Sequence, residues 1–229
     1  MNASIKDPII HWPGIDTVLL DMDGTLLDLH YDNHFWLEYL PRLYAEEHGI
    51  TVAAAHEKLH GAYAREQGTL AWYCLDHWSD RLAMDIPTLK KAVADKIRLR
   101  PHVTAFLGAL RDSGHEVILV TNAHRTTLDI KMAEVDITDW FHHIVVSHDL
   151  AAAKEEQAFW QRLGKTHPFD PSRTLLIDDN EAVLAAAEQY GIGHLLTMLQ
   201  PDSQREVRTT TRYPGIIHFD EIMPGRSQP

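Results

Sequence analysis

Cysteine is almost absent from this chain, because Cys74 is the only thiol among 229 residues. A single thiol excludes an internal disulfide, and it also excludes a zinc site built from several cysteines. The 16 histidines are scattered without the short spacings that are typical of zinc ligands, so the sequence predicts no zinc site. The cysteine content is typical of a protein from a reducing compartment.

Basic residues are also scarce relative to acidic ones. The chain has 21 Lys and Arg residues against 33 Asp and Glu residues, which gives a net charge of -12 at pH 7. Proteins that bind nucleic-acid polymers carry basic faces that displace counterions from phosphates, so we expect no such partner. A small anionic ligand is still compatible with this charge if a cation assists its binding.

Long apolar runs are missing as well. No segment reaches the roughly 18 apolar residues that a membrane helix requires. Residues 1–14 also lack the basic start and long apolar stretch of a secretory signal. We therefore expect a cytoplasmic protein with no membrane partner. The sequence leaves the oligomeric state open, and a monomer is compatible with it.

Short runs of Val, Ile and Leu predict five buried strands, and helical patterns lie between most of them. The helical patterns cover residues 102–114, 154–164 and 180–191. Alternation of strand and helix indicates an α/β fold with a Rossmann-like parallel sheet. The predicted strands are residues 17–21, 116–121, 143–147, 174–179 and 194–198.

Residues 30–98 contain no strand-like run, although they interrupt the α/β pattern directly after the first strand. Helical spacing is clear at residues 51–68 and 87–97. We therefore predict an inserted all-α helical-bundle cap at 30–98, hinged near 28–32 and 98–101. The remaining residues, 1–29 and 99–229, form the predicted α/β core.

Polar side chains follow several of the predicted strands, and the carboxyl ends of parallel strands form the usual ligand site of such a sheet. Crowded carboxylates repel one another unless a cation is present, and Mg²⁺ prefers oxygen ligands. A hydroxyl and an ammonium nearby would bind an anion such as phosphate. A carboxylate could then attack phosphorus, while a second one transfers the proton. The polar residues that follow the predicted strands are Asp21, Asp23, Thr121, Asn122, Lys154, Asp178 and Asp179.

Four motifs in chain order resemble the signature of the haloacid dehalogenase superfamily: Asp21-x-Asp23-Gly24-Thr25, Thr121-Asn122, Lys154 and Asp178-Asp179. The resemblance implies Asp21 as nucleophile and Asp23 as general acid/base and backbone metal ligand. It further implies phosphate binding by Thr121, Asn122 and Lys154, and Mg²⁺ binding by Asp21, Asp23 and Asp178. Gly24, Thr25 and Asp179 would support the site.

The second aspartate favours phosphate esters, because family members that cleave carbon–halogen bonds lack an acid at the position of Asp23. Two features depart from the common pattern. Glu155 follows Lys154, where many relatives have proline, and Ala151 to Ala153 replace a more polar loop. We expect the role of the lysine to be unchanged.

Stretches such as "DNHFW" and "LAWYCLDHWS" resemble a bacterial group of GMP/IMP nucleotidases within that superfamily. The resemblance implies purine nucleoside 5′-monophosphates as substrates. Alternatives are a phosphatase or phosphomutase for a sugar phosphate or phosphoglycolate, and a non-catalytic phosphate-binding regulatory protein. The aromatic residues also suit the core of a helical bundle. The predicted base contacts are Asn33, Trp36, Trp72, Tyr73 and His124.

Overall fold

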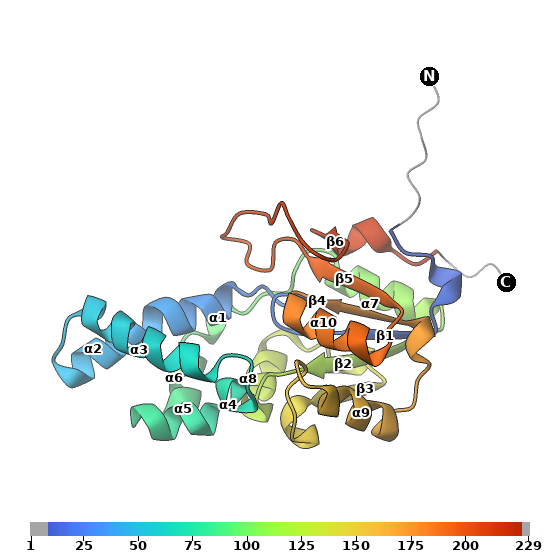
Figure 1. Cartoon of the computed structure of the whole chain (residues 1–229). Helices are drawn as coiled ribbons and strands as arrows, with labels where there is room; N and C mark the ends of the chain where they lie inside the picture. The colour runs from blue at the N-terminus through green and yellow to red at the C-terminus, as the bar shows by residue number, and fades with distance from the viewer. Residues whose placement is uncertain (1–8, 226–229) are drawn as a thin grey trace.

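The computed structural model describes residues 9–225, which contain a six-stranded parallel sheet of order β3-β2-β1-β4-β5-β6 (Figure 1). All five predicted strands are confirmed. The sixth was not predicted because it has only two residues. The strands are β1 Thr17–Leu20, β2 Glu116–Thr121, β3 His143–Val146, β4 Thr174–Asp178, β5 His194–Met198 and β6 Gly215–Ile216.

Helices cover both faces of the sheet, as the α/β pattern predicts. Successive strand side chains point to opposite faces, so Leu19 packs in a core cluster with Trp160 and Leu184. Val18 packs in the other cluster with Phe106. The helices are α7 Val103–Asp112, α8 Arg125–Val135, α9 Gln157–Thr166 and α10 Glu181–Tyr190.

The helix after β4 has the predicted ends, whereas the helix after Lys154 does not. Asn180 accepts a hydrogen bond from the Ala182 amide at 2.9 Å, and α10 ends at Gly191 with φ +111°. By contrast, α9 begins at Gln157, so the prediction of a helix from Lys154 was wrong. Residues 151–156 form turns because the Lys154 side chain is drawn into the sheet edge.

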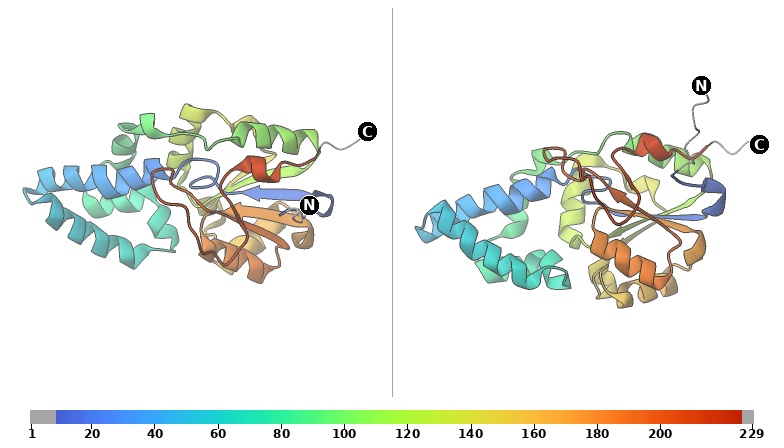
Figure 2. Two further views of the ribbon diagram at one scale, coloured as in Figure 1. Left: turned by 90° about the horizontal axis from the view of Figure 1, so that it is seen from above. Right: turned by 45° about the horizontal axis from the view of Figure 1, so that its top comes forward.

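Residues 30–91 form helices beside the carboxyl ends of the strands, on one side of the sheet (Figures 1 and 2). The predicted helix 87–97 was too long. The α-helix ends at Lys91, and a 3-10 turn at Ala94–Lys96 buries Val93, Ala94 and Ile97 together. The helices are α1 His30–His34, α2 Leu40–His48, α3 Val52–Glu66, α4 Leu70–Tyr73, α5 Leu75–Leu82 and α6 Ile86–Lys91, with a π-helical turn at Phe35–Tyr39.

The two chain segments that join these helices to the sheet lie side by side. Leu27 and Leu99 form an antiparallel bridge. The Asp28 amide donates to the Arg98 carbonyl at 2.9 Å, and the Arg100 amide donates to Leu26 at 2.9 Å. The predicted hinge segments near 28–32 and 98–101 therefore contact each other, which makes them one connection.

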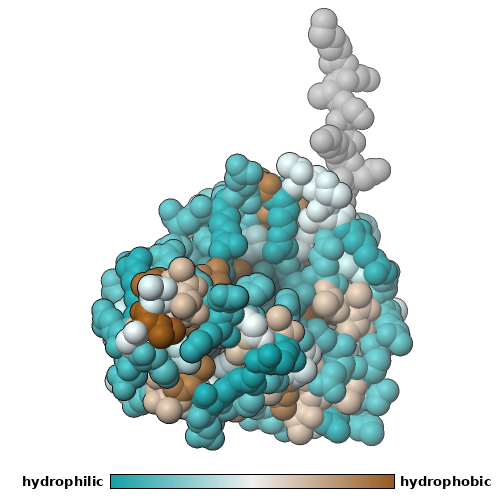
Figure 3. Space-filling view, turned by 60° about the vertical axis from the view of Figure 1, so that its left-hand side comes forward, coloured by the Kyte–Doolittle hydropathy of each residue, from teal (hydrophilic) through white to brown (hydrophobic). Residues whose placement is uncertain are grey.

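The surface agrees with the composition. The face in Figure 3 is mostly hydrophilic, with smaller apolar patches between the polar side chains. Within residues 9–225, no helix combines the length and the apolar character needed to cross a bilayer.

Gly24 is required by a close contact beneath the sheet edge. Its φ is +82°, and an added Cβ would lie 2.7 Å from the carboxyl group of Asp179. We expect Gly24→Ala to lower the free energy of unfolding by about 3 kcal/mol, because strain and contact add. Gly49→Ala is the matched control, since Gly49 has φ +61° but open space around it. It should cost about 1 kcal/mol. Urea unfolding measures both, and equal losses would exclude the contact as the cause.

Candidate active site

One ammonium joins two buried carboxylates at the carboxyl edge of the sheet. Lys154 Nζ donates to Asp21 Oδ1 at 2.6 Å and to Asp178 Oδ2 at 2.7 Å. It also donates to the Val120 carbonyl at 3.1 Å. All three charged side chains are buried. The structure therefore brings together Asp21, which directly follows β1, Asp178 at the end of β4, and Lys154 from the loop before α9, as the sequence predicts.

A third carboxylate completes this group. Oxygens of Asp21, Asp178 and Asp179 lie within 4.8 Å of one another. Burial raises the pKa of Asp21 despite the charge of Lys154. Burial and the charges of the two neighbouring aspartates raise the pKa of Asp179 well above its usual range. If all three carboxylates were ionised, they would carry more negative charge than Lys154 balances, and this repulsion adds to burial in raising the pKa values of Asp21 and Asp179. Carboxylate oxygens are the ligands that Mg²⁺ prefers, so this donor set fits the ion.

The carboxylate of Asp23 lies apart from that group. Its Oδ1 accepts a hydrogen bond from Lys131 Nζ at 2.5 Å, and it faces the cavity described below. The third grouped carboxylate is instead Asp179, which was predicted only to support the site. Metal binding through the Asp23 backbone stays a prediction.

A chain of charges extends from Asp23 into the helical segment. Lys131 also donates to Asp32 Oδ2 at 2.6 Å, and Lys90 donates to Asp32 Oδ1 at 2.9 Å. Burial alone would raise the pKa of Asp32, but the two ammonium groups outweigh it and lower the pKa to about 2. Both lysines are only 1% exposed. Buried ions of this kind are tolerated only when they are paired.

Sequence reasoning missed this network. A lysine in a helix is ordinarily expected at the surface, although the spacing of these two lysines from buried residues indicated otherwise. Lys131 follows Leu128 by three positions and Lys90 follows Ile86 by four, so each lies on the buried face of its helix.

The residues after β2 hold the Lys154 loop. Asn122 Oδ1 accepts a hydrogen bond from the Lys154 amide, and its Nδ2 donates to Glu155 Oε2, both at 2.9 Å. Thr121 is buried, and its Oγ1 accepts from the Ala123 amide at 3.0 Å. Asn122 therefore positions Lys154. Phosphate binding by Thr121 and Asn122 stays a prediction.

Glu155, the residue that departs from the family pattern, connects the sheet edge with the helices. Its Oε1 accepts from the Tyr73 hydroxyl at 2.7 Å and from Asn180 Nδ2 at 3.3 Å. Thr25, two residues after Asp23, is fully buried, and its hydroxyl has no hydrogen-bond partner among the described residues. The contacts of Glu155 were not predictable, because they join three distant segments.

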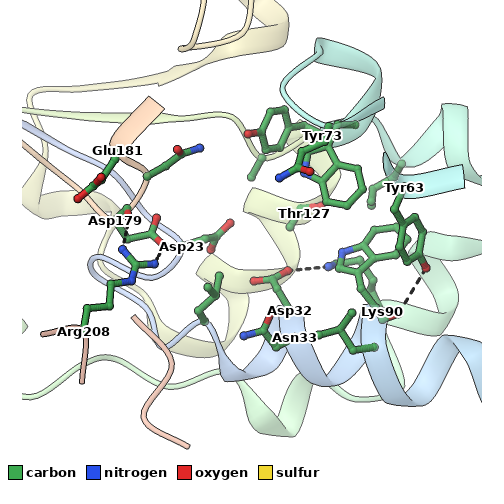
Figure 4. Close-up of a pocket in the computed structure, with 18 of the residues that line it drawn as sticks. Asp23, Asp32, Asn33, Tyr63, Tyr73, Lys90, Thr127, Asp179, Glu181 and Arg208 are labelled. Atoms are coloured by element: carbon green, nitrogen blue, oxygen red, sulfur yellow. Dashed lines mark hydrogen bonds and ion pairs between the residues drawn. The ribbon is translucent and has the colours of Figure 1, made fainter. Parts of the chain in front are cut away.

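A cavity of about 650 Å³ opens between the sheet edge and the helical segment (Figure 4). Asp23, Asp179 and Arg208 line one end, and aromatic rings line the other. The second group includes the predicted residues Trp36, Trp72 and Tyr73, together with Tyr63. The predicted Asn33 also lines the cavity, and its Nδ2 donates to Asp202 Oδ2 at 2.7 Å.

His124 is not among the residues that line the cavity, so its predicted contact with a ligand stays a prediction. Its Nδ1 accepts from the Thr126 amide at 3.4 Å, which caps the start of α8. Its Nε2 lies 3.8 Å from Asp76 Oδ2. The ring therefore accepts a hydrogen bond at the start of its own helix and faces α5.

Arg208 is a cavity residue that the sequence did not indicate. It comes from the long loop between β5 and β6, and its Nη1 donates to the Asp179 carbonyl at 2.7 Å. Its Nη2 lies 3.9 Å from Asp179 Oδ2. A guanidinium group therefore faces the cavity at the carboxylate end (Figure 4). No regular pattern in this loop could have shown that.

Comparison with known proteins agrees with this geometry. Residues 15–191 match the model of the haloacid dehalogenase-like hydrolases. The chain belongs to this family. It is 38% identical over 215 residues to the GMP/IMP nucleotidase YrfG of Escherichia coli (strain K12), covering 94% of this chain and 97% of that protein. The same values hold for YrfG of Shigella flexneri. The resemblance drawn from the four motifs is confirmed, and the chain is a phosphomonoester hydrolase.

Solved structures show the same fold. The haloacid dehalogenase-type phosphatase from Thermococcus onnurineus has a TM-score of 0.73 and 20% identity, with 91% of this chain and 96% of that chain covered. YfnB from Bacillus subtilis, bound to magnesium, has a TM-score of 0.64 and 18% identity over 91% of this chain and 96% of its own. At these identities the likeness concerns the fold alone.

Removal of Lys131 tests the charge network. Lys131→Met should lower the free energy of unfolding at pH 7 by about 3 kcal/mol, because the half-buried carboxylates of Asp23 and Asp32 lose the ammonium between them. The pKa of both carboxyl groups rises in the variant, so at pH 4 they bind protons and the loss should be smaller. Urea unfolding at the two pH values measures this. Lys58→Met, at an exposed site on α3, should change little. A loss that is equal at both pH values would contradict the charge argument.

Proposed function

We propose that the protein hydrolyses purine nucleoside 5′-monophosphates such as GMP and IMP, with Mg²⁺ and through an aspartyl-phosphate. The observation that carries the proposal is the cavity itself. It has carboxylates and Arg208 at one end and Trp36, Trp72 and Tyr73 at the other. A nucleotide has the same two ends, a phosphate and a flat base. The names of the 38%-identical relatives support this choice of substrate.

In the first step, an oxygen of Asp21 attacks phosphorus while the bond to the ester oxygen breaks. Asp23 donates a proton to that leaving oxygen. Burial raises the pKa of Asp23 to about 6, against the charge of Lys131, so part of the population holds the proton near neutral pH. In the second step Asp23 takes a proton from water, and the oxygen of that water attacks phosphorus and releases Asp21.

Two cations beside the grouped carboxylates would bind the phosphoryl oxygens. Lys154 Nζ lies between the nucleophile and Asp178, and Arg208 Nη2 lies 3.9 Å from Asp179 Oδ2. Mg²⁺, held by Asp21, Asp178 and Asp179, would neutralise charge on the phosphoryl group. We propose Arg208 as an additional phosphate contact, because a guanidinium forms bidentate pairs with phosphate oxygens.

The helical segment 30–98 would act as a cap over the core formed by 1–29 and 99–229, of which residues 9–225 are described. It supplies the cavity end farthest from the carboxylates, so it would select the base. A purine has a flat face that stacks on an aromatic ring and polar edges that accept and donate hydrogen bonds.

Phosphate release from a panel of substrates tests the proposed reaction. We expect GMP and IMP to be the best substrates with Mg²⁺ and EDTA to abolish turnover. Asp21→Asn should lower kcat by roughly 10³-fold or more, because no nucleophile remains. The variant's thermal unfolding should match the wild type, which excludes misfolding as the cause.

Other results of the same panel would replace the proposal. A preference for sugar phosphates or phosphoglycolate would give a different substrate, and transfer of phosphate without net release would indicate a phosphomutase. Complete inactivity on the panel would favour a regulatory phosphate-binding protein.

Replacement of Trp72 tests the cap separately. Trp72→Leu keeps an apolar side chain but removes the flat face, so kcat/KM for IMP should fall about tenfold, the value of one stacking contact. Hydrolysis of ribose 5-phosphate, which has no base, should change little. Trp140→Leu, at a tryptophan that does not line the cavity, is the matched control. Equal losses on both substrates in Trp72→Leu would argue against base stacking.

A further inference from the structure

A second group of metal-binding side chains lies outside the cavity. Cys74, Asp76 and His124 each offer a ligand atom, and the three atoms lie within 4.8 Å of one another. Cys74 and Asp76 come from the start of α5, and His124 comes from the start of α8. The absence of zinc-ligand spacing in the sequence therefore does not apply to this group, because its members come from two distant segments.

His148 lies beside His124 in this group, although it is not one of the three residues whose ligand atoms lie together. Its ring centroid lies 5.1 Å from that of His124, with the two rings nearly perpendicular. Both ring nitrogens of His148 are buried, and within the described part of the chain neither has a partner at good hydrogen-bond geometry beyond a weak contact with the Leu70 backbone. A buried nitrogen without a partner costs free energy, so a missing ligand explains it better than packing does.

The two histidines are held next to each other by their neighbours in sequence. Arg125 and Asp149 form an ion pair, and each directly follows one of the histidines. The start of α8 and the 3-10 turn Ser147–Leu150 are therefore joined at the point where both imidazoles lie. This arrangement reduces the conformational freedom that two ligands would lose on binding a metal.

We propose that Cys74, Asp76, His124 and His148 bind a transition-metal ion of the Zn²⁺ type. Thiolate and imidazole ligands favour such ions, whereas Mg²⁺ prefers oxygen ligands alone. Four ligands complete a tetrahedral site. Binding through His124 Nε2, the nitrogen nearer Asp76, places the proton on Nδ1 and replaces the 3.4 Å hydrogen bond from Thr126.

The position of the site gives it a structural consequence. Cys74 and Asp76 belong to the helical segment, while His124 and His148 belong to the part that contains the sheet. Cys74 also directly follows Tyr73, which lines the cavity and bonds Glu155. A bound ion would tie the two parts together next to Tyr73, a residue that lines the cavity.

Cobalt absorption tests the site without any measurement of activity. The full chain is titrated with Co²⁺ in saturating Mg²⁺, with a reductant that does not bind metals. We expect a thiolate-to-cobalt charge-transfer band in the near ultraviolet and the visible bands of tetrahedral Co²⁺, complete at one equivalent. Zn²⁺ should displace the ion, and further Mg²⁺ should not. Cys74→Ser should lose the charge-transfer band.

Further variants separate this site from other metal binding. His148→Gln and His124→Asn should each weaken Co²⁺ binding by at least about tenfold, the loss typical even for outer partners of a metal. Asparagine keeps the helix cap at position 124, so folding is maintained. His56→Gln, at an exposed site on α3, should bind like the wild type. Asp178→Asn should keep the thiolate band, whatever the state of the phosphatase.

Three results would overturn the proposal. One is the absence of a thiolate band in the wild type. Another is its removal by Mg²⁺, and the third is wild-type affinity in both His148→Gln and His124→Asn. None of these depends on the substrate of the enzyme.

Discussion

The pairing of the Lys154 ammonium with Asp21 and Asp178 is the interaction on which the site depends. Two carboxylates buried side by side would cost several kcal/mol without a cation between them. Their closeness follows from the sheet, because β1 and β4 are parallel neighbours with Leu20 beside Ile177. The chain then has to bring an ammonium from a third segment. Asn122 holds the backbone of that segment, and Trp160 Nε1 donates to the Lys154 carbonyl at 2.8 Å.

Much of this could be predicted from the sequence, because parallel strands fix where their ends lie. The apolar runs located β1, β2 and β4, and Asp21, Thr121 and Asp178 follow from their positions at the ends of those runs. Lys154 could be assigned only through its order among the motifs, since a lysine in a loop carries no signal of its own. The family resemblance thus supplied what the periodicity did not.

Other features depend on tertiary packing, which local patterns record only in part. Lys131, Asp32 and Lys90 come from three helices and become a network only when these helices meet. The contacts of Arg208 and Glu155 arise in the same way, each through a loop that crosses to another segment. His124 is the reverse case. A histidine beside a phosphate motif suggested a ligand contact, but the requirement for a helix cap decides its orientation.

The two charge networks differ in whether they include a residue of the helical segment. Lys154 pairs with Asp21 and with another core residue, so the position of the proposed nucleophile does not depend on the helical segment. Lys131 instead pairs with both Asp23 and Asp32, and Asp32 belongs to α1. Any movement of α1 therefore changes the charge balance around Asp23. If Asp23 is the proposed acid and base, then proton transfer, rather than attack on phosphorus, is the step that depends on the position of the helical segment.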